Sequence, residues 1–441
     1  MTLFAVEGVA GSGKTFRLME ILTQTLAETP LAEGQRVLAL TFMHGARRRL
    51  NQKLLGVTGL FGRFECMTID SFAWRLMRRW RGLATAIGLP SIREDQYDQQ
   101  CDAAGALLER SEVRNWIAAS FPVVLIDEAQ DLKPQRLRIV CALAGSLTTL
   151  IAADEFQCLD VNLRPNPLVL WLHQKCKPEV LNRVRRTNVG ALLTAAAAIR
   201  DGAAPCCGPG FNIIPAKSAP MAAAFLANAI GWRPSDSVAI ITPSLTGNFS
   251  QQVVERVCKQ ACGKNGNGPY PIRWERSDDE AIKTLIEDLA ITGEVPVTEA
   301  VAAVDRLPRS GVVRETLAWV QRQARVTGRA TFSFAEIVGV IAEKVTAQRR
   351  WQAGGTYKLV AMTVQQAKNR EFDGVVVLWP FAVGGDPEQK RRLLYNAMTR
   401  AQRWCTIIVQ SDKLLQHPPF TSEGRSAVTQ STRSERESVE E

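Results

Sequence analysis

The chain has 441 residues, a length that suits roughly two to four domains, and 46% of them are hydrophobic, which argues against global disorder. No run approaches the roughly 20 apolar residues of a membrane-spanning helix, and the start lacks the pattern of a secretion signal, so the expected location is the cytoplasm. Lys and Arg number 54 against 44 Asp and Glu, a net charge of +10. This balance is compatible with a nucleic-acid partner and equally with an ordinary basic protein.

The 10 cysteines are scattered along the chain, and in a cytoplasmic protein they are expected to be reduced thiols. Cys258 and Cys262 are one helical turn apart but have no second pair, and His173 with Cys176 is equally isolated. Zinc sites need four such ligands in two groups, so no zinc site is expected.

Short apolar runs alternate with helical patterns in the first part of the chain. The predicted strands are Leu3–Val6, Val37–Thr41, Pro122–Ile126 and Thr149–Ala153, and the predicted helices include Arg17–Ala27 and Ala46–Leu55. This alternation is typical of a parallel sheet that is covered by helices on both faces. We therefore predict a first α/β domain over residues 1–180, with a small helical insertion at about 73–118.

The same alternation resumes in the second part of the chain. The predicted strands here are Ser237–Thr242, Lys358–Thr363, Gly374–Leu378 and Thr406–Val409. They indicate a second α/β domain over residues 181–415, interrupted at about 276–351 by a helical insertion. Residues 416–441 are polar and rich in Ser, Glu and Arg, which predicts a disordered tail.

A phosphate-binding loop follows the first predicted strand. Gly8-Val-Ala-Gly-Ser-Gly13-Lys14-Thr15 fits the pattern GxxxxGK[ST] and opens a predicted helix, which is the context that this motif requires. The loop comprises Gly8, Gly11, Ser12, Gly13, Lys14 and Thr15. Its backbone N–H groups and the helix N-terminus would surround phosphate oxygens, Lys14 would reach the β- and γ-phosphates, and Thr15 would bind Mg²⁺.

Two carboxylates follow the third predicted strand, in the order Asp127 and Glu128. The carboxyl end of a parallel strand faces the ligand crevice, so Asp127 can hold Mg²⁺ there. Glu128 can act as the base that activates water, which favours hydrolysis over transfer to a bound acceptor. The plain alternative is an exposed acidic cap on the strand.

Further segments follow in a fixed order. They are Leu40–Ala46, Met67–Phe72, Ile151–Gln157, Leu181–Thr187, Met362–Phe372 and Arg391–Ala401. With the two motifs above, this set resembles the UvrD/Rep branch of the superfamily 1 DNA helicases, from about Leu3 to Val409. The resemblance implies an α/β fold of two RecA-like P-loop domains with parallel sheets, each with a small helical insertion. It also implies that ATP and Mg²⁺ bind in the cleft between the domains.

The resemblance assigns roles to single residues. Gln157 matches the residue that senses the γ-phosphate, and Glu371 matches a residue near the ribose. Arg185 and Arg400 match two arginines that contact the γ-phosphate, and guanidinium groups suit charge that is spread over phosphate oxygens. The expected catalytic set is therefore Glu128, Gln157, Arg185 and Arg400.

Five residues resemble the family's contacts with single-stranded DNA, namely Phe42, Ser71, Phe72, Thr363 and Gln365. Aromatic faces stack on bases without sequence preference, and polar side chains reach phosphates. For the two phenylalanines, packing in the core is the alternative.

The chain also departs from the family pattern. No glutamine segment that reads adenine precedes the phosphate loop, and Val184 stands where a tyrosine usually stacks on adenine, so the choice of ATP over other nucleotides is open. Cys158, Leu159 and Val161 replace aromatic residues that stack on DNA, and the second insertion is small. Short proteins of this kind occur beside nucleases in bacterial anti-phage systems, so a nuclease partner in phage defence, or a role in DNA repair, is a possible setting.

Two functions follow from these observations. The main hypothesis is an ATP-dependent translocase or helicase on single-stranded DNA, with 3′ to 5′ direction implied by the resemblance alone. The alternative is a DNA-sensing ATPase that regulates a separate effector and unwinds little. A nucleotide-binding scaffold without turnover is disfavoured, because the residues for hydrolysis are all present.

Overall fold

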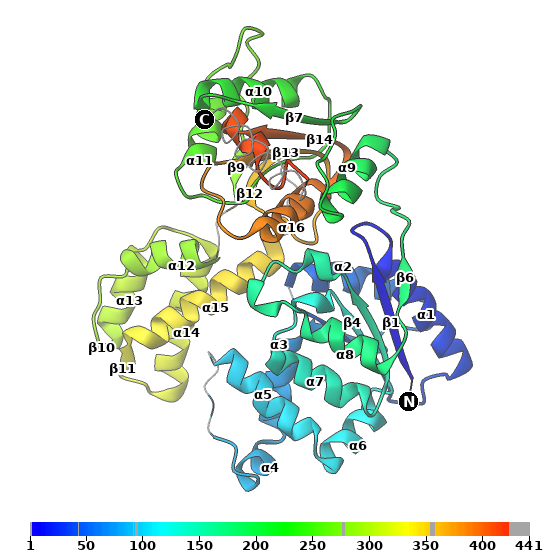
Figure 1. Ribbon diagram of the computed structural model, residues 1–441. Helices are drawn as coiled ribbons and strands as arrows, with labels where there is room; N and C mark the ends of the chain where they lie inside the picture. The colour runs from blue at the N-terminus through cyan, green and yellow to red at the C-terminus, as the bar shows by residue number, and fades with distance from the viewer. Residues whose placement is uncertain are drawn as a thin grey trace, which may run out of the picture. The chain divides into compact units, whose positions relative to one another are not determined.

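A computed structural model describes residues 2–42, 44–90, 92, 96–275, 278–352 and 358–422 (Figure 1). The chain divides into two compact units. Unit 1 contains residues 1–270 and 363–441, and unit 2 contains residues 271–362. Unit 1 holds two parallel-strand sheets, so the predicted α/β class with two RecA-like domains is confirmed.

The first sheet of unit 1 has the strand order β3-β2-β4-β5-β1-β6, and its paired strands run parallel. The strands are β1 (Leu3–Gly8), β2 (Val37–Thr41), β3 (Phe64–Thr68), β4 (Val123–Asp127), β5 (Thr148–Ala153) and β6 (Glu179–Leu181). The helices are α1 (Lys14–Glu28), α2 (His44–Leu55), α3 (Ile69–Arg79), α4 (Arg81–Ala86), α5 (Tyr97–Leu108), α6 (Ser111–Ser120), α7 (Pro134–Ala144) and α8 (Pro167–Lys175). The four predicted strands are present. The sheet edges β3 and β6 were not predicted, because their residues are only partly buried and lack a continuous apolar run.

Two apolar clusters cover opposite faces of this sheet. Along β2, Leu38 and Leu40 belong to one cluster, whereas Val37 and Ala39 belong to the other. Successive side chains of a strand point to opposite faces, so a strand that is buried on both faces must be apolar throughout. The uninterrupted apolar runs in the sequence therefore have a direct structural cause.

The second sheet of unit 1 contains β7, β14, β13 and β8 in that order, again with parallel pairing. The strands are β7 (Phe211–Pro215), β8 (Val238–Thr242), β13 (Phe372–Trp379) and β14 (Ala401–Val409). The helices are α9 (Gly190–Arg200), α10 (Ala219–Gly231), α11 (Phe249–Lys259) and α16 (Pro387–Met398). In unit 1, the residues up to Leu181 form the first half, with the first sheet, and the residues after Leu181 form the second half, with the second sheet. Figure 1 shows α16 between this sheet and the first half of the unit, where it contacts the short helix η2 (Glu155–Gln157).

Unit 2 is mostly helical and includes the region of the predicted insertion at about 276–351. It contains α12 (Asp278–Glu287), α13 (Val297–Arg306), α14 (Gly311–Thr327) and α15 (Phe334–Gln352), with the antiparallel strands β10 (Glu294–Pro296) and β11 (Thr331–Ser333) and the parallel pair β9 (Arg273–Trp274) and β12 (Leu359–Thr363). Its own apolar cluster includes Phe332, whose ring meets that of Trp319 edge to face. Residues 276 and 277, at the predicted start of the insertion, lie outside the described residues.

The tail was predicted to begin at residue 416. Phe420 is nevertheless buried and meets the ring of Trp379 edge to face, with 5.6 Å between ring centroids, so the packed chain extends beyond that position. Residues 423–441 lie outside the described residues. Among the helices that are described, none has the length and apolar character to cross a membrane.

Candidate active site

A cavity of about 260 Å³ in unit 1 is lined by residues from both halves of that unit. Its lining consists of Gly11, Gly13, Lys14, Thr15, Arg49, Leu50, Lys53, Asp127, Glu128, Gln157, Arg185, Arg186, Asn369, Glu371 and Arg400. The structure thus brings together nearly all of the residues that the sequence assigned to ATP. Gly8 and Ser12 belong to the same loop but are not part of the lining.

The phosphate loop connects β1 to α1, and its glycines are needed for its shape. Gly11 and Gly13 have φ of 75° and 91°, a backbone conformation that glycine adopts without steric cost. A Cβ atom on Gly8 would lie 2.7 Å from the carbonyl oxygen of Leu181. The Nζ atom of Lys14 donates to the carbonyl oxygens of Gly8 (2.8 Å) and Val9 (3.2 Å), so the ammonium group is held inside the loop.

Asp127 ends β4 directly opposite the start of α1. Its Oδ2 atom accepts a hydrogen bond from the Thr15 hydroxyl at 2.9 Å. Burial and the neighbouring Glu128 raise the pKa of Asp127 to about 6. A hydroxyl and a carboxylate are hard oxygen ligands, and Mg²⁺ in phosphate sites is held by only one or two protein groups. The donor set therefore fits Mg²⁺, although no group of three or more metal-ligating side chains occurs within the described ranges.

Glu128 occupies a turn with φ of 57°, which an ordinary L-residue rarely adopts. Its Oε2 atom accepts a hydrogen bond from Nε2 of Gln130 at 2.6 Å. The turn places the carboxylate in the cavity lining beside Asp127. Glu128 is thus positioned like a base next to the predicted metal ligand.

Gln157 and Arg400 join the two halves of unit 1 at the cavity. Nη2 of Arg400 donates to Oε1 of Gln157 at 3.1 Å, and its Nε donates to the carbonyl oxygen of Asn396 at 2.9 Å. Arg400 is buried, and burial followed by the charge of Arg186 lowers its pKa to about 10. In the described part of the chain no carboxylate lies within ion-pair distance of this guanidinium, and the charges of Glu128 and Glu371 in the same cavity offset its charge only in part.

Glu371 is held by two arginines at the cavity wall. Its Oε1 atom lies 3.1 Å from Nη2 of Arg186 and 3.9 Å from Nη1 of Arg49, and its Oε2 atom accepts a hydrogen bond from Gln402. Burial alone would raise its pKa, but the charges of Arg186 and Arg49 lower it below the ordinary value. The carboxylate therefore stays ionised in this site.

Positive charge prevails in the cavity. The lining contains Lys14, Arg49, Lys53, Arg185, Arg186 and Arg400, against Asp127, Glu128 and Glu371. Arginine forks and lysine ammonium groups are the usual partners of phosphate oxygens. The excess of cations suits a polyphosphate ligand.

Some residues of this site were not assigned from the sequence. Asp154 lies 3.7 Å from Lys14 and accepts a hydrogen bond from Gln157, and the Tyr395 hydroxyl accepts one from the backbone N–H of Ala10. Both lie in segments that were recognised. Only their contacts across the fold indicate a role.

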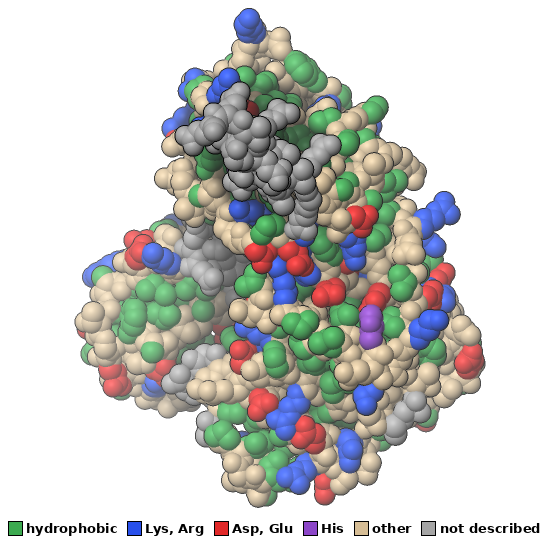
Figure 2. All heavy atoms as spheres, viewed as in Figure 1, with side chains coloured by type: hydrophobic (Ala, Val, Ile, Leu, Met, Phe, Trp, Pro, Cys, Tyr) green, Lys and Arg blue, Asp and Glu red, His purple; other side chains and the backbone are tan. Residues whose placement is uncertain are grey.

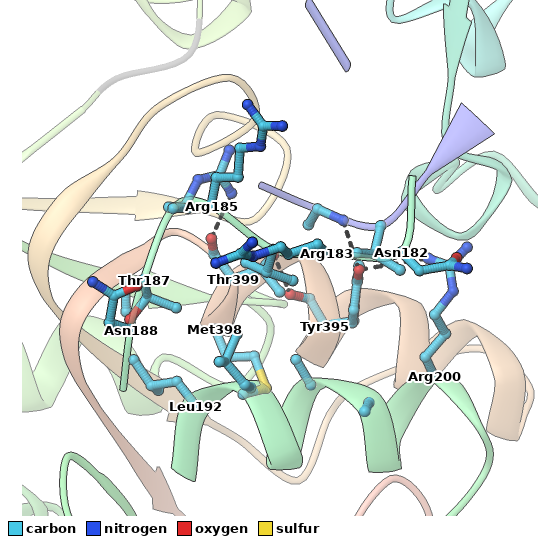
Figure 3. Close-up of a pocket in the computed structure, with 18 residues that line it drawn as sticks. Asn182, Arg183, Arg185, Thr187, Asn188, Leu192, Arg200, Tyr395, Met398 and Thr399 are labelled. Atoms are coloured by element: carbon cyan, nitrogen blue, oxygen red, sulfur yellow. Dashed lines mark hydrogen bonds between the residues drawn. The ribbon is translucent and has the colours of Figure 1, made fainter. Parts of the chain in front are cut away.

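A larger cavity of about 780 Å³ adjoins the start of the phosphate loop (Figure 3). It is lined by residues 182–188, by α9 and by the end of α16. In Figure 3, Arg200 and Tyr395 lie near one another, and Leu192 lies on the apolar wall that α9 provides. Arg185 and Arg186 line both cavities.

Two family models match the chain. The model of the AAA domain matches residues 1–211, and the model of the UvrD-like helicase C-terminal domain matches residues 358–408. These matches support the predicted resemblance to the UvrD/Rep-like helicases of superfamily 1.

Among solved structures, this chain is similar to one titled "Crystal structure of Arterivirus nonstructural protein 10 (helicase)". The identity is 11% and the TM-score is 0.40, and the alignment covers 95% of this chain. This chain spans 62% of the length of that helicase. No curated protein matches the sequence.

The residues that were predicted to contact DNA have different environments. Phe42 is partly buried against the first core cluster, and the Arg136 guanidinium lies 5.7 Å from its ring centroid. Phe72 is only 4% exposed and belongs to that core. A ring in this position cannot stack on a base, so Phe72 is corrected from a DNA contact to a core residue.

The three polar residues of that set remain accessible to different degrees. The Ser71 hydroxyl shares a hydrogen bond of 2.8 Å with the Thr68 hydroxyl, and the Thr363 hydroxyl donates to Gln366 at 3.2 Å. Gln365 is exposed. Figure 2 shows Lys and Arg side chains interspersed with Asp and Glu on the face in view, so charge does not mark one nucleic-acid path there.

Proposed function

We propose that the chain is a Mg²⁺- and ATP-dependent translocase or helicase on single-stranded DNA, moving 3′ to 5′ like the family it resembles. The observation that supports this proposal best is the hydrogen bond between Arg400 and Gln157 at the phosphate cavity. It joins the two halves of unit 1 at the position where a γ-phosphate would bind. A group bound there would hold both halves together, and its loss would release them.

The residues of the first half bind the phosphates and activate the attacking water. The Lys14 ammonium exchanges the carbonyl oxygens of Gly8 and Val9 for phosphate oxygens, and backbone N–H groups of the loop bind further phosphate oxygens. Thr15 and Asp127 would hold Mg²⁺, which when bound neutralises the charge that develops on the phosphate oxygens. Gln130 donates a hydrogen bond to Oε2 of Glu128 and so orients this carboxylate. Glu128 accepts the proton of the attacking water.

The residues of the second half complete the site. Arg400 and Arg185 contribute guanidinium groups to the same phosphate, and Arg185 is anchored because its backbone N–H donates to the carbonyl oxygen of Gly11 at 2.7 Å. Charge on three equatorial oxygens is stabilised by such groups when hydrolysis occurs. Because the arginines belong to the other half, hydrolysis and the relative movement of the halves are coupled.

One observation favours the alternative, a DNA-sensing ATPase that regulates a separate effector such as a nuclease. The segment after Gln157 carries no aromatic residue in place of the family's stacking residues. Residues of α16 hold this segment through hydrogen bonds from Arg392 to the carbonyl oxygen of Cys158 and from Gln389 to that of Leu159. Weak stacking on bases would suit a protein that senses DNA better than one that unwinds it.

The deciding experiment measures ATP hydrolysis by the purified protein with and without single-stranded DNA, with Glu128→Gln as the control. DNA stimulation that disappears in Glu128→Gln supports the proposal, and displacement of a strand from a 3′-tailed duplex then separates the helicase from the regulatory ATPase. A hydrolysis rate that DNA does not change contradicts the motor function. Hydrolysis that survives in Glu128→Gln contradicts the assignment of the base.

A further inference from the structure

Asp154 connects groups from both halves of unit 1. Its side chain is fully buried, its Oδ2 atom accepts a hydrogen bond from Nε2 of Gln157 at 2.8 Å, and its Oδ1 atom accepts one from Nη1 of Arg200 at 2.8 Å. Nζ of Lys14 lies 3.7 Å from the Oδ2 atom. A buried carboxylate needs such partners, because burial of an unpaired charge is costly.

The bond between Asp154 and Gln157 fixes the orientation of an amide. A carboxylate can only accept hydrogen bonds, so it selects the Nε2 side of the Gln157 amide. The Oε1 side must then point the other way, and it accepts the hydrogen bond from Arg400. Asp154 thus determines which face of Gln157 is presented to the arginine at the phosphate cavity.

These hydrogen bonds form a continuous network of four residues. Arg200 donates to Asp154 at 2.8 Å, Gln157 donates to Asp154 at 2.8 Å, and Arg400 donates to Gln157 at 3.1 Å. The two ends belong to the second half of unit 1, and the two middle residues belong to the first half. Arg200 is the last residue of α9 and Arg400 directly follows Thr399, the C-cap of α16. The hydrogen-bond network is therefore complete only while both halves of unit 1 are in contact.

Arg200 is held in place by more than one group. Its guanidinium lies 5.2 Å from the ring centroid of Phe156 and 5.7 Å from that of Tyr395, and the Tyr395 hydroxyl is within 3.5 Å of Nη1. Figure 3 shows Arg200 at one end of the larger cavity, near Tyr395. Burial lowers its pKa, but Asp154 outweighs this effect and raises the pKa above the ordinary value.

We propose that Arg200 is a positioning residue for nucleotide hydrolysis, which acts through Asp154 and Gln157 to set the pose of Arg400. This inference rests on the proposed hydrolysis of ATP at the smaller cavity. Arg200 itself does not line that cavity, so it does not contact the phosphates. Its ion pair with Asp154 also leaves Lys14 free to move from the carboxylate to the phosphates, because Asp154 keeps a cation when Lys14 departs.

A purely structural role for Arg200 is the competing explanation. It predicts that removal of Arg200 lowers the melting temperature and that the surviving folded protein has a normal kcat. A positioning role predicts a lower kcat in protein that is folded and binds nucleotide normally. A displaced catalytic group can cost about 10²-fold in rate, so an effect on kcat is measurable.

The experiment compares Arg200→Ala and Arg200→Lys with a matched control, Arg183→Ala. Arg183 lines the same larger cavity, is exposed, and has no ion pair within the described residues. For each variant, kcat and KM for ATP are measured with single-stranded DNA present, together with the melting temperature and the affinity for a fluorescent ATP analogue. We expect Arg200→Ala to lower kcat by about tenfold or more, with affinity within about twofold of wild type.

Further variants make the result specific. Arg200→Lys keeps a cation near Asp154 and should recover part of the lost kcat, whereas Arg183→Ala should behave like wild type. Asp154→Asn should lower kcat as well, and its combination with Arg200→Ala should cost less than the two single effects multiplied, because both act along one path.

Three results would overturn the positioning role. They are a normal kcat in Arg200→Ala, no recovery in Arg200→Lys, or independent effects of the Asp154 and Arg200 substitutions. Absence of hydrolysis in the wild-type protein would instead overturn the proposed function, and the positioning role with it. Wild-type hydrolysis with a normal kcat in Arg200→Ala would remove only the positioning role.

Discussion

The hydroxyl oxygen of Tyr395 on α16 accepts a hydrogen bond of 2.9 Å from the backbone N–H of Ala10 in the phosphate loop. Burial, reinforced by the charge of Asp154, raises the pKa of Tyr395 to about 12, so the hydroxyl is neutral at physiological pH. The contact is buried and links residues that are 385 positions apart. The second half of unit 1 therefore fixes the conformation of the phosphate loop in the first half.

We expect Tyr395→Phe to weaken both the fold and nucleotide binding. The substitution leaves the buried N–H of Ala10 without an acceptor, which typically costs about 1–3 kcal/mol. Urea denaturation should show this loss, and KM for ATP should rise. Tyr97→Phe is the control, because Tyr97 is 55% exposed. Equal stability and equal KM in the two variants would show that the contact has no effect.

Thr15→Val tests the predicted magnesium site. Valine keeps the shape of threonine but cannot donate to Asp127 or bind a cation. We expect the variant to need a higher Mg²⁺ concentration for half-maximal ATP hydrolysis, and chelation of Mg²⁺ by EDTA should abolish hydrolysis in the wild type. Thr23→Val, whose hydroxyl only donates to the carbonyl oxygen of Met19 within α1, is the control. Identical Mg²⁺ titrations of both variants would contradict the role of Thr15.

The sequence predicted the parts of the fold that depend on local pattern. Strands that are buried on both faces, such as β2 and β4, are continuous apolar runs. In the phosphate loop, Gly11 and Gly13 of the motif have positive φ values, which glycine adopts without steric cost. The edge strands β3 and β6 were missed because a partly exposed strand has no such run. Local pattern thus predicts what the core requires and misses the edges.

The candidate site shows the same limit in its contacts. Lys14, Asp127 and Arg400 were assigned because each lies in a motif, and all three line the cavity. The roles of Asp154 and Arg200 depend on partners elsewhere in the chain, and no sequence spacing encodes those distances. Phe72 was assigned by position in a motif, but its helix α3 turns the ring into the core.

Phe42 and Phe72 should respond differently to replacement by alanine. Phe72→Ala removes a core ring and should lower the free energy of unfolding by about 3–5 kcal/mol. In the protein that remains folded, DNA should stimulate ATP hydrolysis as it does in the wild type. Phe42→Ala should lower DNA stimulation of ATP hydrolysis more than the basal rate, because its ring is only partly buried. Denaturation curves and hydrolysis with and without DNA measure both effects. Equal loss of basal and stimulated rates in Phe42→Ala would place Phe42 with Phe72 as a core residue.

Glu336 in unit 2 gives a prediction about pH. Its Oε2 atom accepts a hydrogen bond from the backbone N–H of Ser333, and the Ser333 hydroxyl accepts one from the N–H of Glu336, a reciprocal cap at the start of α15. The guanidinium of Arg329, with this cap, lowers the pKa of Glu336 from 4.5 to about 2. The carboxylate therefore stabilises the fold above pH 4.5, and this contribution is lost as the pH falls from 4.5 through 2.

We expect Glu336→Gln to speed hydrogen exchange at the start of α15 at pH 7. The difference from wild type should shrink as the pH falls toward 3, and the side chain is 39% exposed, so solvent screening keeps the effect small. Hydrogen exchange with mass spectrometry of peptides over residues 329–340 measures it. Glu343→Gln is the control, because Glu343 is more exposed and pairs only with Lys344. A difference that grows at low pH would contradict the assignment.

Arg400 combines a catalytic prediction with one about stability. Its guanidinium is buried, and burial lowers its pKa to about 10, so the side chain stays charged at physiological pH while the folded state bears the cost of burying that charge. Arg400→Met should therefore leave the melting temperature of the nucleotide-free protein unchanged or raise it, while kcat falls by about 10³-fold or more. Arg403→Met is the control, since Arg403 is exposed on β14 and should change neither quantity. A variant that melts earlier than the control and still hydrolyses ATP would show that Arg400 supports the structure and does not act on the phosphate.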